Sequence, residues 1–348
     1  MAPASPSSRE ASGPGRCDIE VVQVAISSFD LETWRAWYIG VLGFVPSGFL
    51  NPRAFLAESA AIGDTPPDLR AVMGTPAAPA DMMYWLLDQQ DFFQYELFQF
   101  DLSMVSPLPE GWRPCDIGYT MIGLHVVDWD GTLARLRRHG VPTLTEPIGP
   151  PGSRRVCLRD PDGIRLELME DDLRTPRPRP RPRPGIPVVT RSVTASVPDV
   201  ARSVQFFTEV LGFQCADSGV VLHDEHHEQL WGLPGARREV ALLWIGDFWL
   251  ELVQYADPIG KPWPAEYRLG DQGILNIALG TRSLETYQAV CDAVARSGAQ
   301  VNIPFESDFN LTTYLVDAQG FSVEIAYLTN EADALLGFIA DGEATPPA

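Results

Sequence analysis

The apolar and polar positions of the chain repeat in a fixed order. Residues Val21 to Phe44 begin with an apolar run that predicts a short strand, followed by a polar turn that ends at Asp30. Bulky residues then recur at helical spacing until Gly43, where a helix is expected to end. The same order returns at Val193 to Phe213, with Asp199 in the turn. An internal repeat of this kind predicts that the chain contains duplicated structural units.

A second kind of unit starts at Ile117. The strand-like alternation there ends in an acidic turn at Asp128, and an amphipathic helix is expected over Gly131 to His139. Two further strands, Arg154–Arg159 and Gly163–Met169, are joined by the turn sequence Asp-Pro-Asp-Gly. The C-terminal part repeats this order. We therefore predict four modules, each with one strand, one helix and three strands.

Each predicted module places one glutamate among the apolar residues of a late strand. In the first and third modules these strands read YELFQF and LELVQY, and in the second and fourth the glutamate follows a turn at the same distance. Charged side chains are seldom buried without a partner or a role. The candidate catalytic residues are therefore Glu96, Glu167, Glu251 and Glu324.

Residues 174–187 form the clearest boundary, because every second residue is proline over most of the segment. Proline fixes φ and removes a backbone donor, so an extended spacer is expected, although its arginines could also dock on the acidic surface of the same chain. The predicted organisation is a disordered tail (1–16), a first domain of two modules (17–173), the Arg-Pro linker (174–187), a second domain of two modules (188–330) and a C-terminal tail (331–348).

Composition narrows the class of protein. The chain has 348 residues, 45% of them hydrophobic, and a formal net charge of −20, which argues against binding to nucleic acid. Its five cysteines are widely spaced and form no CxxC pair, so we expect neither disulfides nor a zinc knuckle. No signal-like or membrane-spanning apolar stretch is present, and a reduced, cytoplasmic setting is the expectation.

The module pattern resembles the vicinal oxygen chelate superfamily, which includes glyoxalases, methylmalonyl-CoA epimerase, extradiol dioxygenases and bleomycin-binding resistance proteins. The resemblance is carried by the two Leu-Gly-Phe cassettes, the Asp160-to-Gly163 turn with Glu167, and the two ELxQ-aromatic strands. It implies an α+β fold of βαβββ modules in two pairs, in which each pair curls its strands into an open cleft. It also implies two tandem glyoxalase-like domains.

The resemblance implies positions for ligands as well. In metal-binding members, a divalent ion is held by one residue on the first strand of each module, commonly histidine, and by the glutamates. Here the first-strand positions carry no histidine; they are Gln23, Met121, Ser192 and Asn276. If a metal is bound, the expected ligands are Gln23, Glu96 and Glu167, but the thioether of Met121 is a poor neighbour for hard oxygen ligands. We expect no required cofactor, or a weakly bound divalent metal.

Two opposed carboxyl groups in an apolar cleft favour acid–base chemistry, because burial and mutual repulsion keep one protonated and leave the other as a base. With consecutive modules paired, the expected pairs are Glu96 with Glu167 and Glu251 with Glu324. Such a pair can move a proton next to a carbonyl, as isomerases, epimerases and lyases do. A metal-free protein that sequesters an aromatic ligand stays open as an alternative. A metal-dependent dioxygenase is less favoured, because neither cleft has the His-His-Glu triad.

Other residues are weaker candidates. The phenol of Tyr119 could stabilise an enolate, and Trp249 lies on a strand expected to line a cleft. The run from His223 to Glu228 contains residue types that bind metals, but its continuous polarity is typical of a solvated loop; a lid or a general base over the second cleft is the alternative. The expected partner is a small-molecule carbonyl or aromatic ligand, and the chain is expected to be a monomer or a homodimer.

Overall fold

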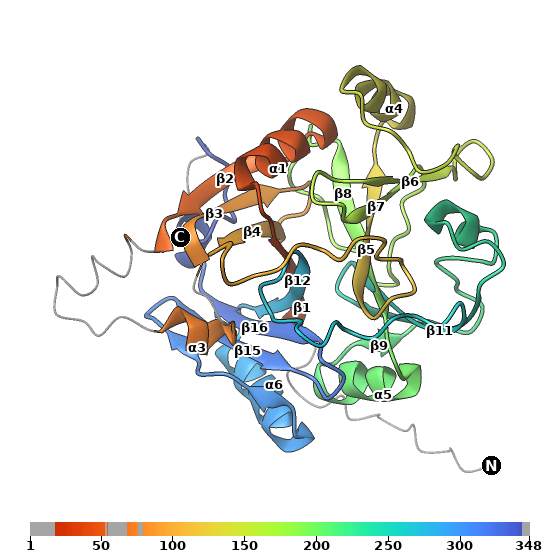
Figure 1. The fold of residues 1–348 in the computed structure, drawn as a ribbon. Helices are drawn as coiled ribbons and strands as arrows, with labels where there is room; N and C mark the ends of the chain where they lie inside the picture. Colours follow the sequence, from red (N-terminus) through yellow and green to blue (C-terminus); the bar gives the residue numbers. More distant parts are fainter. Residues whose placement is uncertain (1–17, 53, 55–67, 76–78, 343–348) are drawn as a thin grey trace, which may run out of the picture.

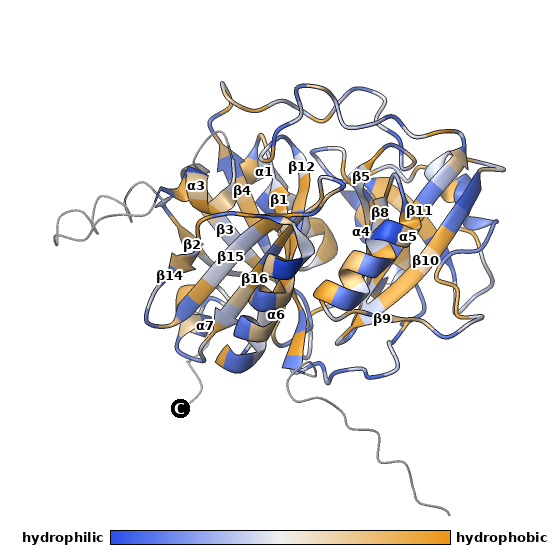
Figure 2. Ribbon diagram, turned by 90° about the horizontal axis from the view of Figure 1, so that it is seen from below, coloured by the Kyte–Doolittle hydropathy of each residue, from blue (hydrophilic) through white to orange (hydrophobic). Residues whose placement is uncertain are grey.

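The computed structural model describes residues 18–52, 54, 68–75 and 79–342 of the chain. The described residues form two sheets that lie side by side, with helices packed against them (Figure 1). Figure 2 shows the same pair from below, with the larger sheet (sheet A) on the left and the smaller sheet (sheet B) on the right. The predicted α+β fold of paired modules is confirmed. The tail predicted at 1–16 lies outside the described residues.

The first two modules follow the predicted order of elements. Module 1 consists of β1 (Ile19–Ser27), α1 (Leu31–Trp37), the π-helical turn η2 (Tyr38–Leu42), β2 (Val45–Leu50), α3 (Leu69–Met73), β3 (Pro79–Leu87) and β4 (Gln94–Phe100). Module 2 consists of β5 (Gly118–Val126), α4 (Trp129–Arg138), β6 (Arg155–Arg159) and β7 (Arg165–Met169). The remaining strand expected in module 2 is reduced to isolated bridges at Thr143 and Ile148.

The last two modules repeat the pattern. Module 3 consists of β8 (Val188–Ser196), α5 (Val200–Gln205), the π-helical turn η3 (Phe206–Val210), β9 (Gln214–Cys215), the 3₁₀ helix η4 (His227–Trp231), β10 (Arg237–Ile245) and β11 (Phe248–Asp257). Module 4 consists of β12 (Gly273–Thr281), α6 (Leu284–Ser297), β13 (Gln300–Val301), β14 (Phe305–Glu306), β15 (Asn310–Val316) and β16 (Ser322–Leu328), and α7 (Ala332–Leu335) follows it.

The helix that follows the first strand of every module begins with the same cap. The side chains of Asp30, Asp128, Asp199 and Ser283 each accept a hydrogen bond from the backbone N–H three residues further on. This bond satisfies one of the free N–H groups of the first helical turn. The polar turn residues of the sequence repeat are therefore N-caps, and they fix where each helix starts relative to the strand before it.

The two sheets do not correspond to the two halves of the chain. Sheet A has the order β13-β15-β16-β12-β1-β4-β3-β2 and combines modules 1 and 4, whereas sheet B has the order β6-β7-β5-β8-β11-β10-β9 and combines modules 2 and 3. The first strands pair antiparallel at each centre, β1 with β12 and β5 with β8. The prediction that consecutive modules pair is therefore wrong. The repeat identifies modules, but which first strands pair is a long-range choice that local periodicity does not encode.

One large apolar core fills the space between the helices and both sheets. It takes residues from each sheet, such as Val24 and Ile122, and from the helices, such as Trp34 and Leu136. The module junctions are tied by polar contacts as well: Trp34 Nε1 donates to Asp160 Oδ2 at 2.8 Å, which links α1 to the turn between β6 and β7. The opposite face of each sheet carries smaller, separate clusters, and these faces form the two clefts.

The Arg-Pro segment at 174–187 contains no helix or strand, as predicted, but it joins two modules of one sheet and docks on acidic groups. Arg179 Nε lies 2.6 Å from Glu20 Oε2, and Arg174 Nε lies 3.2 Å from Asp247 Oδ2. Arg183 donates to the backbone oxygen of Phe338 at 2.6 Å. This segment, called the strap below, thus contacts both sheets. Part of the region predicted as a C-terminal tail packs against it.

Candidate functional site

Cleft A lies on the face of sheet A that is turned away from α1 and α6. Glu96 on β4 and Glu324 on β16 flank the central strands β1 and β12. Beside Glu96 in the register lies Ala25, and beside Glu324 lies Ala278, so small side chains leave space between the two carboxyl groups. The strands place an aromatic residue on the outer side of each glutamate, Trp85 beside Glu96 and Tyr314 beside Glu324.

The cavity of cleft A has a volume of about 330 Å³. Its wall is predominantly apolar and comes from both modules, with α3 on one side and the segment after α7 on another. Phe338, predicted to lie in a C-terminal tail, is buried and forms part of this wall. The aromatic residues of the wall are Trp85, Phe98, Phe305, Phe309, Tyr314 and Phe338.

The two carboxyl groups of cleft A are buried and incompletely bonded. Trp85 Nε1 donates to Glu96 Oε1 at 3.3 Å, and Tyr314 hydrogen-bonds to Glu324. The second oxygen of each group, Glu96 Oε2 and Glu324 Oε2, has no hydrogen-bond partner. Because unpartnered buried polar atoms are costly, these oxygens mark a place where a ligand can bind.

The electrostatics of the pair follow from its burial. Burial, and then the charge of Glu324, raise the pKa of Glu96 well above its usual value, and the polar side chains of Trp85 and Gln23 offset this only in part. Burial raises the pKa of Glu324 to about 7. Near neutral pH one group of the pair therefore holds a proton while the other is available as a base.

Two amide side chains accompany this pair. Gln23 on β1 lines the cavity. Asn276 on β12 is fully buried opposite Ala25, and neither polar atom of its amide has a hydrogen-bond partner. Asn276 shares its strand face with Ala278, since side chains two residues apart point the same way. The polar side chains gathered on this face are therefore those of Gln23, Glu96, Asn276 and Glu324.

Cleft B, on the corresponding face of sheet B, is filled by the chain itself. A plug segment, residues 222–231, runs over Glu167 on β7 and Glu251 on β11. The ring of His223 lies between the two carboxyl groups, with Nδ1 2.7 Å from Glu251 Oε2 and Nε2 3.1 Å from Glu167 Oε1. Trp231 Nε1 donates to Glu167 Oε2 at 3.0 Å. The predicted solvated loop is thus wrong for His223 and Glu228, which are buried, and holds for Asp224 to His226, which are exposed.

The charges of cleft B are matched by His223 and by Arg155, whose Nη1 lies 3.1 Å from Glu167 Oε1. Burial alone would lower the pKa of His223, but the charges of Glu167 and Glu251 outweigh it and raise the pKa to about 9. Burial alone would raise the pKa of both glutamates, yet the His223 charge and its hydrogen bonds hold the pKa of Glu167 well below, and that of Glu251 below, the usual value. An imidazolium between two carboxylates is the stable state at neutral pH.

The structure separates the residues that were expected to act together. Glu96 lies with Glu324, and Glu167 lies with Glu251, so the predicted pairs Glu96–Glu167 and Glu251–Glu324 are wrong. For the same reason Glu167 does not join Gln23 and Glu96 in a metal site. The error follows directly from the assumption that consecutive modules share a sheet.

The other predicted contacts are mostly structural. Met121 packs in an apolar cluster with Trp231 under the plug segment. Ser192 is buried against Gly123, which has no room for a side chain because a Cβ there would lie 2.2 Å from Ser192 Oγ. The hydroxyl of Tyr119 donates to the backbone oxygen of Ser322 at 3.0 Å, and Trp249 Nε1 donates to the backbone oxygen of Leu173 at 3.0 Å.

Sequence reasoning missed two residues of the sites. Tyr314 was not singled out, although strand alternation opposite Glu324 would have placed it on the cleft face. His223 was read with its polar neighbours, although Leu222 before it and Leu230 and Trp231 after it signalled a segment that is partly buried. These apolar residues are the signal that a solvated loop would lack.

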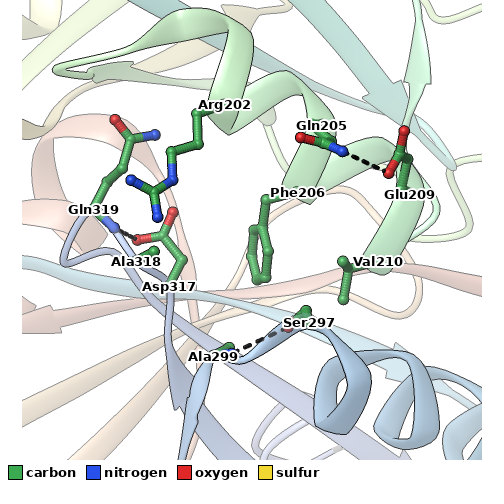
Figure 3. A pocket seen from close by; sticks show the side chains of 10 residues that line it. All are labelled: Arg202, Gln205, Phe206, Glu209, Val210, Ser297, Ala299, Asp317, Ala318 and Gln319. Carbon is green, nitrogen blue, oxygen red and sulfur yellow. Dashed lines mark hydrogen bonds between the residues drawn. The ribbon is translucent and has the colours of Figure 1, made fainter.

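A further hollow lies between α5 and the segment that follows α6, with a volume of about 230 Å³ (Figure 3). Its polar side chains already have partners: Gln205 Nε2 donates to Glu209 Oε2 at 3.0 Å, and Gln319 donates to the backbone oxygen of Asp199 at 3.1 Å. The hollow therefore marks the junction of modules 3 and 4 and does not resemble a second reactive site.

The fold and its paired acidic clefts define a protein of the class built from paired βαβββ modules. The Glyoxalase/Bleomycin resistance protein/Dioxygenase superfamily matches residues 20–168 and 191–325, and the chain belongs to this family. Each matched region covers two consecutive modules, although the sheets combine modules from both regions. Among the described residues, no helix has both the length and the apolar character needed to cross a membrane.

Solved structures share this fold over nearly the whole chain. Glyoxalase I from Zea mays is 16% identical, with a TM-score of 0.57 and coverage of 92% of this chain and 95% of that one. A putative dioxygenase from Bacillus subtilis is 13% identical, with a TM-score of 0.58 and coverage of 91% and 90%. At these identities the likeness concerns the fold alone. A comparison with curated protein sequences finds no match.

The family implies a divalent metal, and the donor chemistry of the clefts tests this. Within the described parts of the chain, no group of three or more His, Cys, Asp or Glu side chains is arranged to hold a metal ion. Cleft A nevertheless offers two carboxyl groups and two amides, with orphaned oxygens on Glu96, Glu324 and Asn276. Such an all-oxygen set suits Mg²⁺ or Mn²⁺ better than Zn²⁺. In cleft B, His223 lies between the carboxylates, where a cation would bind.

Proposed function

We propose that this protein is a small-molecule enzyme that works in cleft A and moves a proton at a carbon next to a carbonyl group, as an isomerase, epimerase or lyase does. The observation that carries the proposal is the buried pair of Glu96 and Glu324, each with a free oxygen in one apolar cavity. Cleft B is assigned a structural role because its equivalent pair is already bonded to His223.

The pair can divide the two roles between its members, because one carboxyl group holds a proton near neutral pH while the other is ionised. The ionised carboxylate accepts the proton from the substrate carbon, and the C–H electron pair moves into the carbonyl to give an enolate. The protonated carboxyl group then returns a proton to the substrate, and the pair is reset when the proton passes from the first group to the second through solvent.

The developing negative charge needs a donor. The candidates for this role are the amide of Gln23, which lines the cavity, and the buried, unpartnered amide of Asn276, in place of Tyr119, whose hydroxyl is engaged. Mg²⁺ or Mn²⁺ held by Gln23, Glu96, Asn276 and Glu324 would supply polarisation of the carbonyl oxygen. The apolar wall excludes water, which strengthens each of these interactions.

The test is exchange of hydrogen for deuterium. A panel of aromatic 2-hydroxyketones and 2-hydroxyaldehydes is incubated with the full-length protein in D₂O, and the loss of the C–H signal next to the carbonyl is followed by NMR. Glu324→Gln and Glu96→Gln are each expected to slow exchange by roughly 100-fold. Glu285→Gln, at an exposed position in the first turn of α6, is the matched control and should leave the rate unchanged.

The alternative function, sequestration of an aromatic ligand without turnover, is favoured by the predominantly aromatic and aliphatic wall of cleft A. The same experiment distinguishes the two. If a ligand from the panel binds by calorimetry, no compound exchanges its proton, and both glutamine variants keep the wild-type affinity, the protein is a binder and the enzymatic proposal is wrong.

A further inference from the structure

We infer that the ligand group which meets the carboxyl pair of cleft A is a planar nitrogen heterocycle of the azole type, with nitrogen atoms on two edges of the ring. The inference rests on the proposed function only in placing the working site in cleft A. It comes from a comparison of the two clefts, one of which already contains such a ring.

The two carboxyl pairs lie at equivalent positions of the two sheets. In both sheets the glutamates lie on strands that flank a central antiparallel pair of first strands. On the neighbouring first strand, the residue paired with each glutamate has a small side chain or none. These residues are Ala25 and Ala278 in sheet A and Gly123 and Thr194 in sheet B. The duplication therefore gives the two clefts the same acidic floor, and what satisfies one pair is a guide to what satisfies the other.

In cleft B an azole ring bridges the pair. His223 uses both ring nitrogens, one for each glutamate, and the residue is 3% exposed. Arg155 and Trp231 also donate to Glu167, while Glu251 Oε1 has no hydrogen-bond partner. The indole of Trp231 meets the imidazole edge-on, with ring centroids 4.8 Å apart. A flat ring with hydrogen-bonding groups on two edges, held beside an aromatic wall, thus occupies this kind of floor in cleft B.

None of the described residues that line cleft A is a histidine. By its place in the chain, the counterpart of the plug in module 1 is the segment between β2 and β3, and residues 51–78 include no histidine. Its described part includes α3, which contributes the apolar side chains of Val72 and Met73 to the wall. Glu96 Oε2 and Glu324 Oε2, the atoms that would receive the ring, are left without partners.

The lining of cleft A adds a charge requirement. None of the described residues that line it is Lys, Arg or His, and the chain as a whole carries a net charge of −20. An anionic ligand would meet repulsion with no compensating partner. A neutral or protonated azole with an apolar substituent fits, because the ring can bridge the carboxyl pair while the substituent packs against Trp85, Phe98 and Phe309. The cavity of about 330 Å³ lies in the size range of ligand pockets.

The test is calorimetric binding of 4-phenylimidazole to the full-length protein after removal of metal with EDTA. Two comparison probes are used: 1-methyl-4-phenylimidazole, in which one ring edge is blocked, and phenylacetate, an anion. We expect 4-phenylimidazole to bind at least roughly tenfold more tightly than its methyl derivative, and phenylacetate to show no binding. The double variant Glu96→Gln/Glu324→Gln should weaken 4-phenylimidazole by roughly tenfold or more, while Glu285→Gln should not.

Several results would overturn the inference: equal affinity for the two imidazoles, tighter binding of phenylacetate, or binding of 4-phenylimidazole only after Mn²⁺ or Zn²⁺ is added. Should the double variant fail to fold, as judged by thermal unfolding, the single variants Glu96→Gln and Glu324→Gln replace it, and wild-type affinity of both for 4-phenylimidazole counts against the inference. If the azoles fail but Glu324-dependent deuterium exchange is seen, the ligand class falls and the enzymatic function stands. If the azoles bind as expected but no compound exchanges its proton, the enzymatic function falls and the ligand class stands.

Discussion

The Nδ1 atom of His223 lies 2.7 Å from Oε2 of Glu251, at the bottom of cleft B and largely out of contact with solvent. The opposite ring nitrogen reaches Glu167, and Arg155 Nη1 lies 3.1 Å from the same carboxylate, so an imidazolium and a guanidinium together balance two buried carboxylates. In this cleft the chain supplies its own cations. The arrangement turns one of two equivalent clefts into a structural element, and it makes the protein dependent on a single imidazole.

Replacement of His223 by alanine is expected to lower the free energy of unfolding by roughly 3 kcal/mol, because Glu167 and Glu251 would be left as buried charges with fewer partners. Urea unfolding at pH 7 measures the change. His226→Ala is the matched control, since the side chain of His226 is 72% exposed, and it should shift stability by less than about 0.5 kcal/mol. A His223→Ala protein as stable as the control would show that the buried bridge contributes little.

The stability of the protein should fall as the pH rises from about 6.5 to about 9. The pKa of His223 is raised from 6.5 to about 9 in the folded state, so its stabilisation is complete below pH 6.5 and is lost as the pH passes through 9. The loss corresponds to roughly 3 kcal/mol as an upper figure. Chemical unfolding across this range measures it. In His223→Ala this part of the pH dependence should vanish, and a profile identical to wild type would contradict the assignment.

Glu324→Gln is expected to stabilise the protein at pH 8 and to have little effect at pH 5. Burial raises the pKa of Glu324 from 4.5 to about 7, so the folded state favours the protonated form, and stability is lost as the pH rises through 7. A neutral amide of the same shape avoids that loss. The melting temperature at the two pH values provides the measurement, with Glu285→Gln as the exposed control. Destabilisation at pH 8 would mean that the carboxylate has a partner which the structure does not show.

The strap should respond to salt. Arg179 is half exposed and its partner Glu20 is largely buried, so Arg179→Gln is expected to destabilise modestly, by less than about 1 kcal/mol, at low ionic strength. The difference from wild type should shrink in 0.5 M NaCl, because salt screens such pairs. Arg177→Gln, an exposed position in the same segment, is the control. Equal effects of the two substitutions would argue against a specific role for the Arg179–Glu20 pair.

Much of the fold was accessible from the pattern of residues. The capping residues Asp30, Asp128 and Asp199 mark the starts of helices, and the hairpin of β3 and β4 follows from alternation. The glutamates were recognised as buried because apolar neighbours surround them. Local rules suffice for these features, since each depends on contacts a few residues apart.

Which residues meet in each cleft could not be predicted from the sequence. Glu96 meets Glu324 across 228 positions of sequence because β1 pairs with β12, a choice made by tertiary packing. The role of His223 was hidden for a related reason: its polarity is satisfied by two residues from distant strands, and nothing adjacent in the sequence reports them. Short-range periodicity cannot reveal partners of this kind.

The nesting of the sheets has a consequence for how the chain is assembled. All strands of sheet B come from one continuous block, residues 118–257, whereas sheet A needs strands from both ends of the polypeptide. During synthesis the inner block is complete before the last module has been made. A chain cut short after that block would retain every strand around His223 yet possess only half of the hollow that contains Glu96, and the shared core would lack the side chains that module 4 supplies.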